Sequence, residues 1–103
     1  MGSCDFYQTA NGKTPDEAFQ SARDTAGYEH GHGGYSGTIV EKHEGFVMIP
    51  LPAGEKAYVY AEQLMEEDDE RISDKWGPAG CIDMGARGSA GERKYLFFGY
   101  ASS

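Results

Sequence analysis

One stretch of the chain, residues 14–40, restricts the fold most because it carries both a helix start and a helix stop. Thr14 caps the first turn, and Glu17 completes a capping box three residues later. Pro15 occupies the first helical position, where its missing N–H costs nothing. A narrow apolar stripe follows at helical spacing: Ala18, Phe19, Ala22 and Ala26. Glycines then end the helix before a strand begins at Thr38: Gly27, Gly31, Gly33 and Gly34.

Apolar runs elsewhere predict the other elements. Five strands are expected, at residues 4–9, 38–43, 46–49, 81–84 and 94–100, with a second helix that begins near residues 54–56. The second and third strands are close enough along the chain to form an antiparallel hairpin around Glu44 and Gly45. The run Tyr95–Phe98 is apolar on both faces, which places the last strand at the centre of a sheet. The glycine-rich segments 77–80 and 85–92 indicate irregular loops.

The element order therefore predicts an α+β fold. We expect a two-layer sandwich in which a five-stranded, mainly antiparallel sheet carries both helices on one face. The chain has 103 residues, which is the size of one domain, and no linker or repeat divides residues 1–103.

The net charge of −8 restricts the choice of partner. A protein that binds nucleic acid directly needs basic clusters for the phosphates, so this class is not expected. A basic protein partner fits such a surface better, although acidic charge also simply keeps small proteins in solution. No apolar run approaches the roughly 20 residues of a membrane helix. The first residues lack the basic segment and apolar run of a secretory signal, so we expect a cytoplasmic protein with free thiols at Cys4 and Cys81.

Carboxylates are concentrated at the end of the second helix. Seven lie within thirteen residues: Glu62, Glu66, Glu67, Asp68, Asp69, Glu70 and Asp74. Acids at a helix C-terminus oppose the helix dipole, so either the helix frays there or the charge serves recognition. Trp76 follows directly, and a tryptophan beside charge anchors either an interface or the core. These eight residues are the candidate partner-binding site, and a solvated helix end is the alternative.

A second candidate site is the loop from Glu29 to Tyr35. His30 and His32 have the alternating spacing that points two imidazoles the same way on an extended chain, as a zinc site requires. The third ligand would be Glu29, His43 or a cysteine, but no local spacing fixes it. The alternative is a glycine-rich turn with two solvated histidines. Two ligands do not make a site, so no metal or other cofactor is assigned.

Sequence motifs for catalysis are absent. Cys81 follows a rigid loop and has histidines elsewhere in the chain, but a small core residue is the simpler interpretation. The chain is therefore expected not to be an enzyme.

Two C-terminal segments, DKWGPAGCI (residues 74–82) and FFGYASS (residues 97–103), together with residues 28–42, carry a resemblance. They are similar to short acidic proteins encoded by bacteriophages and by mobile elements of their hosts. The resemblance covers most of the chain and transfers no assigned activity or functional residue. It implies an accessory protein that binds host machinery, a class that includes anti-CRISPR and anti-restriction inhibitors.

These observations lead to one functional hypothesis and two alternatives. The hypothesis is a non-enzymatic phage-type protein that acts in the host cytoplasm. It inhibits a nucleic-acid-handling or defence complex by covering a basic surface with its acidic run. The alternatives are a small-ligand or metal-binding module at Glu29–Tyr35, and a structural protein that assembles, for instance as a homodimer, through exposed sheet edges.

Overall fold

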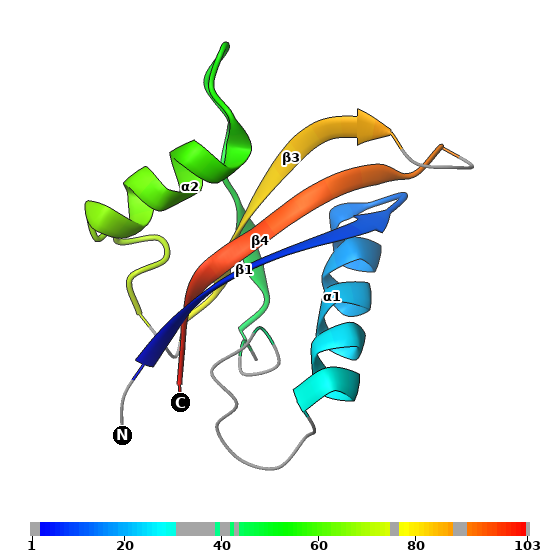
Figure 1. Cartoon of the computed structure of the whole chain (residues 1–103), viewed down its shortest axis with the longest axis horizontal. Coiled ribbons are helices and arrows are strands. Elements are labelled where there is room, and N and C mark those ends of the chain that lie inside the picture. Colours follow the sequence, from blue (N-terminus) through cyan, green and yellow to red (C-terminus); the bar gives the residue numbers. More distant parts are fainter. Residues whose placement is uncertain are drawn as a thin grey trace.

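The computed structural model describes residues 3–30, 39, 42, 44–74, 77–87 and 91–102. These residues form two helices and four strands (Figure 1). In chain order they are β1 (Ser3–Gly12), α1 (Pro15–His30), β2 (Phe46–Met48), α2 (Ala57–Glu66), β3 (Ala79–Arg87) and β4 (Arg93–Ser102).

The sheet is organised around β4. Its strand order is β1-β4-β3-β2, in which β1 and β3 run antiparallel to β4 and β2 runs parallel to β3. The register places Gly99 opposite Phe6 on one side of β4 and Phe97 opposite Cys81 on the other. The α+β class and the central position of the last strand are therefore confirmed.

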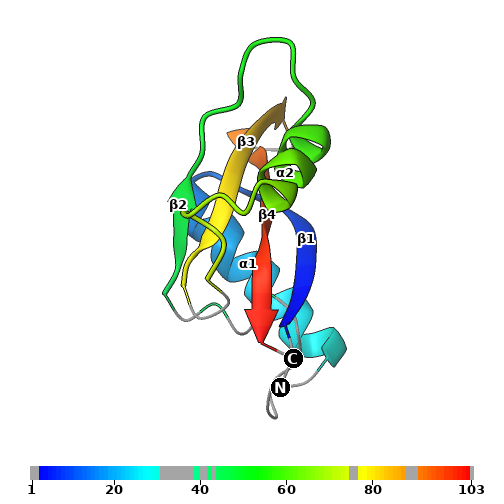
Figure 2. The same cartoon turned by 90° about the vertical axis from the view of Figure 1, so that its left-hand side faces the viewer.

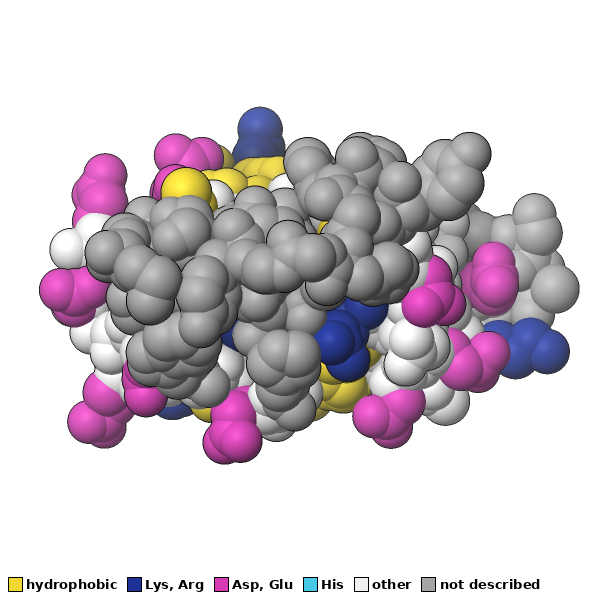
Figure 3. All heavy atoms as spheres, turned by 90° about the horizontal axis from the view of Figure 1, so that it is seen from below, with side chains coloured by type: hydrophobic (Ala, Val, Ile, Leu, Met, Phe, Trp, Pro, Cys, Tyr) yellow, Lys and Arg dark blue, Asp and Glu magenta, His cyan; other side chains and the backbone are white. Residues whose placement is uncertain are grey.

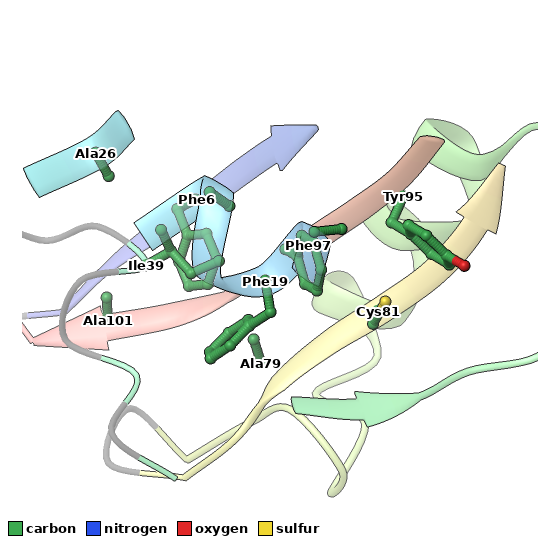
Figure 4. Close-up of a cluster of buried hydrophobic side chains, with 11 residues drawn as sticks. Phe6, Phe19, Ala26, Ile39, Ala79, Cys81, Tyr95, Phe97 and Ala101 are labelled. Carbon is green, nitrogen blue, oxygen red and sulfur yellow. The ribbon is translucent and has the colours of Figure 1, made fainter. Parts of the chain in front are cut away.

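The two helices cover opposite faces of this sheet (Figure 2). Successive residues of a strand point to opposite faces, so neighbours in β4 join different clusters. Phe97 packs on the α1 side against Phe19, at a ring-centroid distance of 5.4 Å (Figure 4). The ring of Phe46 lies 5.7 Å from that of Phe97. Phe98 packs on the α2 side with Leu64. The prediction of both helices on one face is wrong, because a central strand that is apolar on both faces needs cover on both.

The start of α1 follows the predicted capping pattern. The backbone N–H of Glu17 donates to Thr14 Oγ1 over 3.2 Å. Helix α1 can approach the end of β1 closely because small residues line the inner face of the helix. A Cβ added at Gly12 would lie 2.5 Å from the backbone nitrogen of Ala18. The helix continues through Gly27 and ends at His30, within the predicted range of glycines, although Gly27 itself does not stop it. A single glycine inside a helix costs only about 1 kcal/mol.

The inner side of α2 is formed by buried residues: Ala57, Ala61, Leu64 and Met65. Tyr60 is partly buried against them. The helix begins at Ala57, one residue after the predicted start region.

The predicted strand at residues 38–43 is wrong where the structure describes it. Ile39 lies in a 3-10 turn and Lys42 belongs to no strand, and the N–H of Lys42 donates to the carbonyl of Ile39. The other four residues of this segment lie outside the described part of the chain. The predicted hairpin is also wrong, since β2 pairs with β3 and in parallel orientation. The sheet formed by the described residues therefore has four strands, not five.

The predicted loop at residues 77–80 is wrong in its second half. Strand β3 already begins at Ala79 and continues to Arg87, well into the second predicted loop. Gly80 is a strand residue that permits tight packing, because a Cβ there would lie 2.7 Å from the ring of Phe98 and 2.9 Å from Ile72. Glycine is therefore needed at position 80 because core residues on the α2 side approach the backbone closely, and not because the chain turns there.

Removing the cap of α1 should destabilise the fold. We expect Thr14→Ala to lower the free energy of unfolding by about 1 kcal/mol, since the Glu17 N–H loses its acceptor. Thr25→Ala, at an exposed position inside the same helix, is the matched control and should be neutral or slightly stabilising. Urea denaturation measures both. Equal effects of the two substitutions would show that Thr14 does not cap the helix.

Candidate functional site

Most of the predicted acidic site lies on the outer side of α2 and in the turns that follow it. Six of its carboxylates are exposed: Glu62, Glu66, Glu67, Asp68, Glu70 and Asp74. Trp76 lies outside the described residues. Figure 3 shows Asp and Glu side chains spread around the periphery of the molecule, and exposed acids outside α2 include Asp5, Asp16 and Asp24. The acidic charge is therefore not confined to α2.

The end of α2 is fixed by its backbone. The N–H of Asp69 donates to the carbonyl of Leu64, and that of Asp68 to the carbonyl of Met65, which is the Schellman pattern. Asp68 takes the left-handed position with φ +54°, where glycine is usual. The hydroxyl of Tyr100 in β4 also donates to the Met65 carbonyl, over 3.1 Å. These bonds place the carboxylates after Glu66 beside the sheet instead of on a frayed end.

Asp69 is paired within the turn. Its two carboxylate oxygens accept from Nε and Nη2 of Arg71, each over 2.9 Å, and its Oδ1 also accepts from the Arg71 backbone N–H. The Arg71 guanidinium holds the pKa of the Asp69 carboxyl below its ordinary value. Asp69 therefore shapes the turn, and its charge is compensated locally.

Asp74 lies beside a buried lysine. Its carbonyl accepts from the backbone N–H of Gly77 over 2.9 Å and from Nζ of Lys42 over 3.2 Å. Lys42 is completely buried and passes close to Gly99, where a Cβ would lie 3.7 Å from its Cε. Burial lowers the pKa of Lys42 to about 8, and the charge of Asp74 partly opposes this shift. The sequence pattern did not reveal this interior cation.

Three of the predicted carboxylates, Glu62, Glu66 and Asp68, act together with Asp5 of β1 on two tyrosines. Burial raises the pKa of Tyr7, and the charges of Asp5, Glu62 and Glu66 raise it further. Burial likewise raises the pKa of Tyr100, with added contributions from Asp68 and Asp5. Both hydroxyls therefore lie in one negative field. We call this group the acidic face: Asp5, Glu62, Glu66 and Asp68.

Asp5 is the member that sequence analysis missed. It lies on β1, more than fifty residues from the acidic run, and is exposed. The apolar pattern of residues 4–9 placed Asp5 on a strand next to the buried Phe6. It gave no information on which helix would lie near this strand.

A shallow groove of about 250 Å³ runs along α2 within the acidic face. Val59, Glu62, Gln63 and Glu66 line it, from successive turns of the helix. Val59 is 53% exposed and Tyr58 beside it is 44% exposed. The groove thus joins carboxylates to a small apolar surface, which suits a cationic side chain with an aliphatic stem.

The described residues provide no further set of metal-binding side chains. Among them, no three His, Cys, Asp or Glu side chains are placed to hold a metal ion. The histidine loop is not tested by this, because residues 31–38 and the side chains of Glu29 and His30 lie outside the described part. Cys81 is a core side chain whose pKa burial raises to about 12, while Cys4 is exposed, and both are free.

Comparisons of the chain with protein-family models, with curated proteins and with solved structures found no match. In the described part of the chain, neither helix has the length and apolar composition needed to cross a membrane.

The buried Lys42 should make stability depend on pH in the alkaline range. The pKa of this lysine is about 8 when folded and about 10.5 when unfolded, so between these values the unfolded chain binds more protons. Its contribution to the free energy of unfolding therefore rises with pH through this window. Cys81 acts in the opposite sense above pH 9, because burial raises the pKa of its thiol.

Comparison with Lys42→Met at each pH isolates the lysine. We expect the wild type to gain about 1–2 kcal/mol relative to this variant between pH 7.5 and 9.5. Lys56→Met, at an exposed lysine, controls for the loss of a positive charge. Urea denaturation across the pH range measures the effect. Parallel profiles for the wild type and Lys42→Met would contradict the buried cation.

Proposed function

We propose that this protein is a non-enzymatic inhibitor whose acidic face covers a basic, nucleic-acid-binding surface of a host complex. The observation that carries the proposal is the position of Asp5 opposite Tyr100 in the sheet, while the Tyr100 hydroxyl donates to the carbonyl of Met65 in α2. The charges of Asp5, Glu62 and Glu66 act together on Tyr7, and those of Asp5 and Asp68 on Tyr100. Separate elements bring like charges together around Tyr7 and Tyr100. A row of carboxylates held by a folded scaffold presents negative charge in the way that a phosphate backbone does.

The position of these charges has a cost for folding, which supports a role outside folding. Glu66 lies in the last turn of α2, where the helix dipole disfavours an acid and where the last turn has no basic residue. Asp68 holds a left-handed backbone conformation that glycine or asparagine adopts more readily. Arg71, the one cation in the sequence between residues 62 and 74, is bound to Asp69 and does not neutralise the acidic face.

The composition of the surface also favours a protein partner. The groove along α2 adds exposed apolar area at Val59 and Tyr58 beside the carboxylates. Interfaces with proteins use aromatic and apolar anchors, with charges that steer the encounter and fix its register. A basic protein surface that ordinarily holds nucleic acid offers Arg and Lys side chains, whose aliphatic stems can contact the apolar area and whose charges can pair with the carboxylates. We place this activity in the host cytoplasm and, from the resemblance of the C-terminal segments, in the anti-CRISPR or anti-restriction class of phage proteins.

Reversing charge on the acidic face should abolish capture of the partner. We expect the double variant Glu62→Lys/Glu66→Lys to bind a host target at least about tenfold more weakly. Asp24→Lys/Glu44→Lys is the matched control, since it changes net charge equally at exposed positions outside the acidic face. Capture from a nuclease-treated host lysate identifies the target, and its nucleic-acid binding is then measured with each variant present. The proposal fails if the Glu62 and Glu66 variant binds and inhibits as well as the control.

A neutral substitution at Asp68 should separate stability from binding. Asp68→Asn keeps the side-chain shape and the left-handed turn but removes a charge that opposes the helix dipole. We expect it to stabilise the fold by about 0.3–1 kcal/mol and to weaken target binding. Thermal unfolding and target titration test the two effects. A variant that is less stable, or that binds the target more tightly, would contradict a recognition role for this carboxylate.

A further inference from the structure

Strand β1 is a long, regular edge. It pairs with β4 over ten consecutive residues with no shift in register. Figures 1 and 2 show it at the border of the sheet. Within the described ranges, no strand pairs with its other side. Half of the backbone hydrogen-bonding groups of an edge strand point away from its sheet, so this edge is a template for a further strand.

The usual protection of a sheet edge is missing here. Natural edge strands are short, or carry proline, lysine or a bulge. β2, at the other edge, spans only three residues. β1 has no proline and no lysine, and its single charge is Asp5. In a chain of net charge −8, this nearly neutral edge is a distinctive surface.

We propose that two copies of the chain pair through β1, antiparallel and around a two-fold axis at Thr9. In an antiparallel pair, opposite residues either both hydrogen-bond across the pair or both do not. Along β1, every second residue points its backbone N–H and C=O away from β4. Such a residue can pair only with a residue of the second copy that also points outward, so an odd-numbered residue faces an odd-numbered one and an even-numbered residue faces an even-numbered one. In the proposed register, the numbers of two opposite residues add up to 18, and Thr9 faces Thr9.

Charge complementarity selects this register. It places Asp5 of one copy opposite Lys13 of the other, twice by symmetry; Asp5 lies near the start of β1, and Lys13 directly follows its last residue. It also places Phe6 opposite Gly12, and the two Thr9 side chains opposite each other. Cross-strand threonine pairs and pairs of opposite charge both stabilise antiparallel sheets. Lys13 and Asp5 are exposed and Thr9 is half-buried, so the side chains are available.

The pairing leaves the packing of each copy intact. Phe6 and Ala10 remain on the α1 side and Tyr7 on the α2 side, because opposite residues of a pair point to the same face. The two acidic faces therefore lie on the same side of one continuous sheet of two four-stranded halves. The net charge of each copy opposes association, which makes the dimer concentration-dependent. This inference does not rest on the proposed function: it is argued from the edge of β1 and from Lys13, and Asp5 is the one residue that it shares with the acidic face.

A cysteine on the axis tests the register directly. In a Cys4→Ser background, Thr9→Cys should form an intermolecular disulfide on mild oxidation, because the two Cα atoms would lie about 4.5–5.5 Å apart. Asn11→Cys is the control, since its two copies would be about 13 Å apart along the strands, beyond disulfide reach. Equal cross-linking at the two positions, or none at Thr9, overturns the proposal.

A charge swap tests the complementarity with no disulfide. Asp5→Lys and Lys13→Asp should each weaken dimerisation about tenfold, and the two together should restore it. Sedimentation equilibrium over a concentration series measures the dissociation constant. A wild-type monomer at the highest attainable concentration overturns the proposal, as does a double variant no tighter than the single ones. The readout is self-association in the absence of any target, so it does not depend on the acidic face as an inhibitor.

Discussion

The structure depends on one strand that is apolar on both faces. Tyr95 and Phe97 of β4 point toward α1, and Leu96 and Phe98 point toward α2. All four are almost fully buried. A strand of this kind is stable only at the centre of a sheet with cover on each side. The pairing with β1 and β3, the opposite positions of the two helices and the glycine at position 80 all follow from this requirement.

The sequence predicted the elements better than their arrangement. Both helices and the central place of β4 were recognisable, because capping residues and apolar spacing act locally. The side of the sheet that each helix covers was not predicted correctly, although the run Tyr95–Phe98 is apolar on both faces. An apolar pattern on both faces requires cover on both, which excludes two helices on the same face. The parallel pairing of β2 had no local signal, since nearness along the chain favoured a hairpin.

For the candidate site, too, the sequence predicted the residues better than their arrangement. The acidic run was visible as composition, but its charges are not equivalent once folded. Asp69 is bound to Arg71, and Asp74 lies beside the buried Lys42. Asp5 joins Glu62 and Glu66 around Tyr7 only because β1 lies near α2. Which carboxylates remain uncompensated is a property of tertiary structure, and a count of acids along the chain does not contain it.

The central claim is that the acidic face takes the place of nucleic acid on a basic partner, and competition measures this directly. The protein would be immobilised, loaded with the host protein that it captures, and challenged with increasing nucleic acid at low and at moderate salt. The account predicts that nucleic acid releases the partner competitively and that higher salt weakens the complex. A partner that stays bound while it also binds nucleic acid, at either salt concentration, would contradict it.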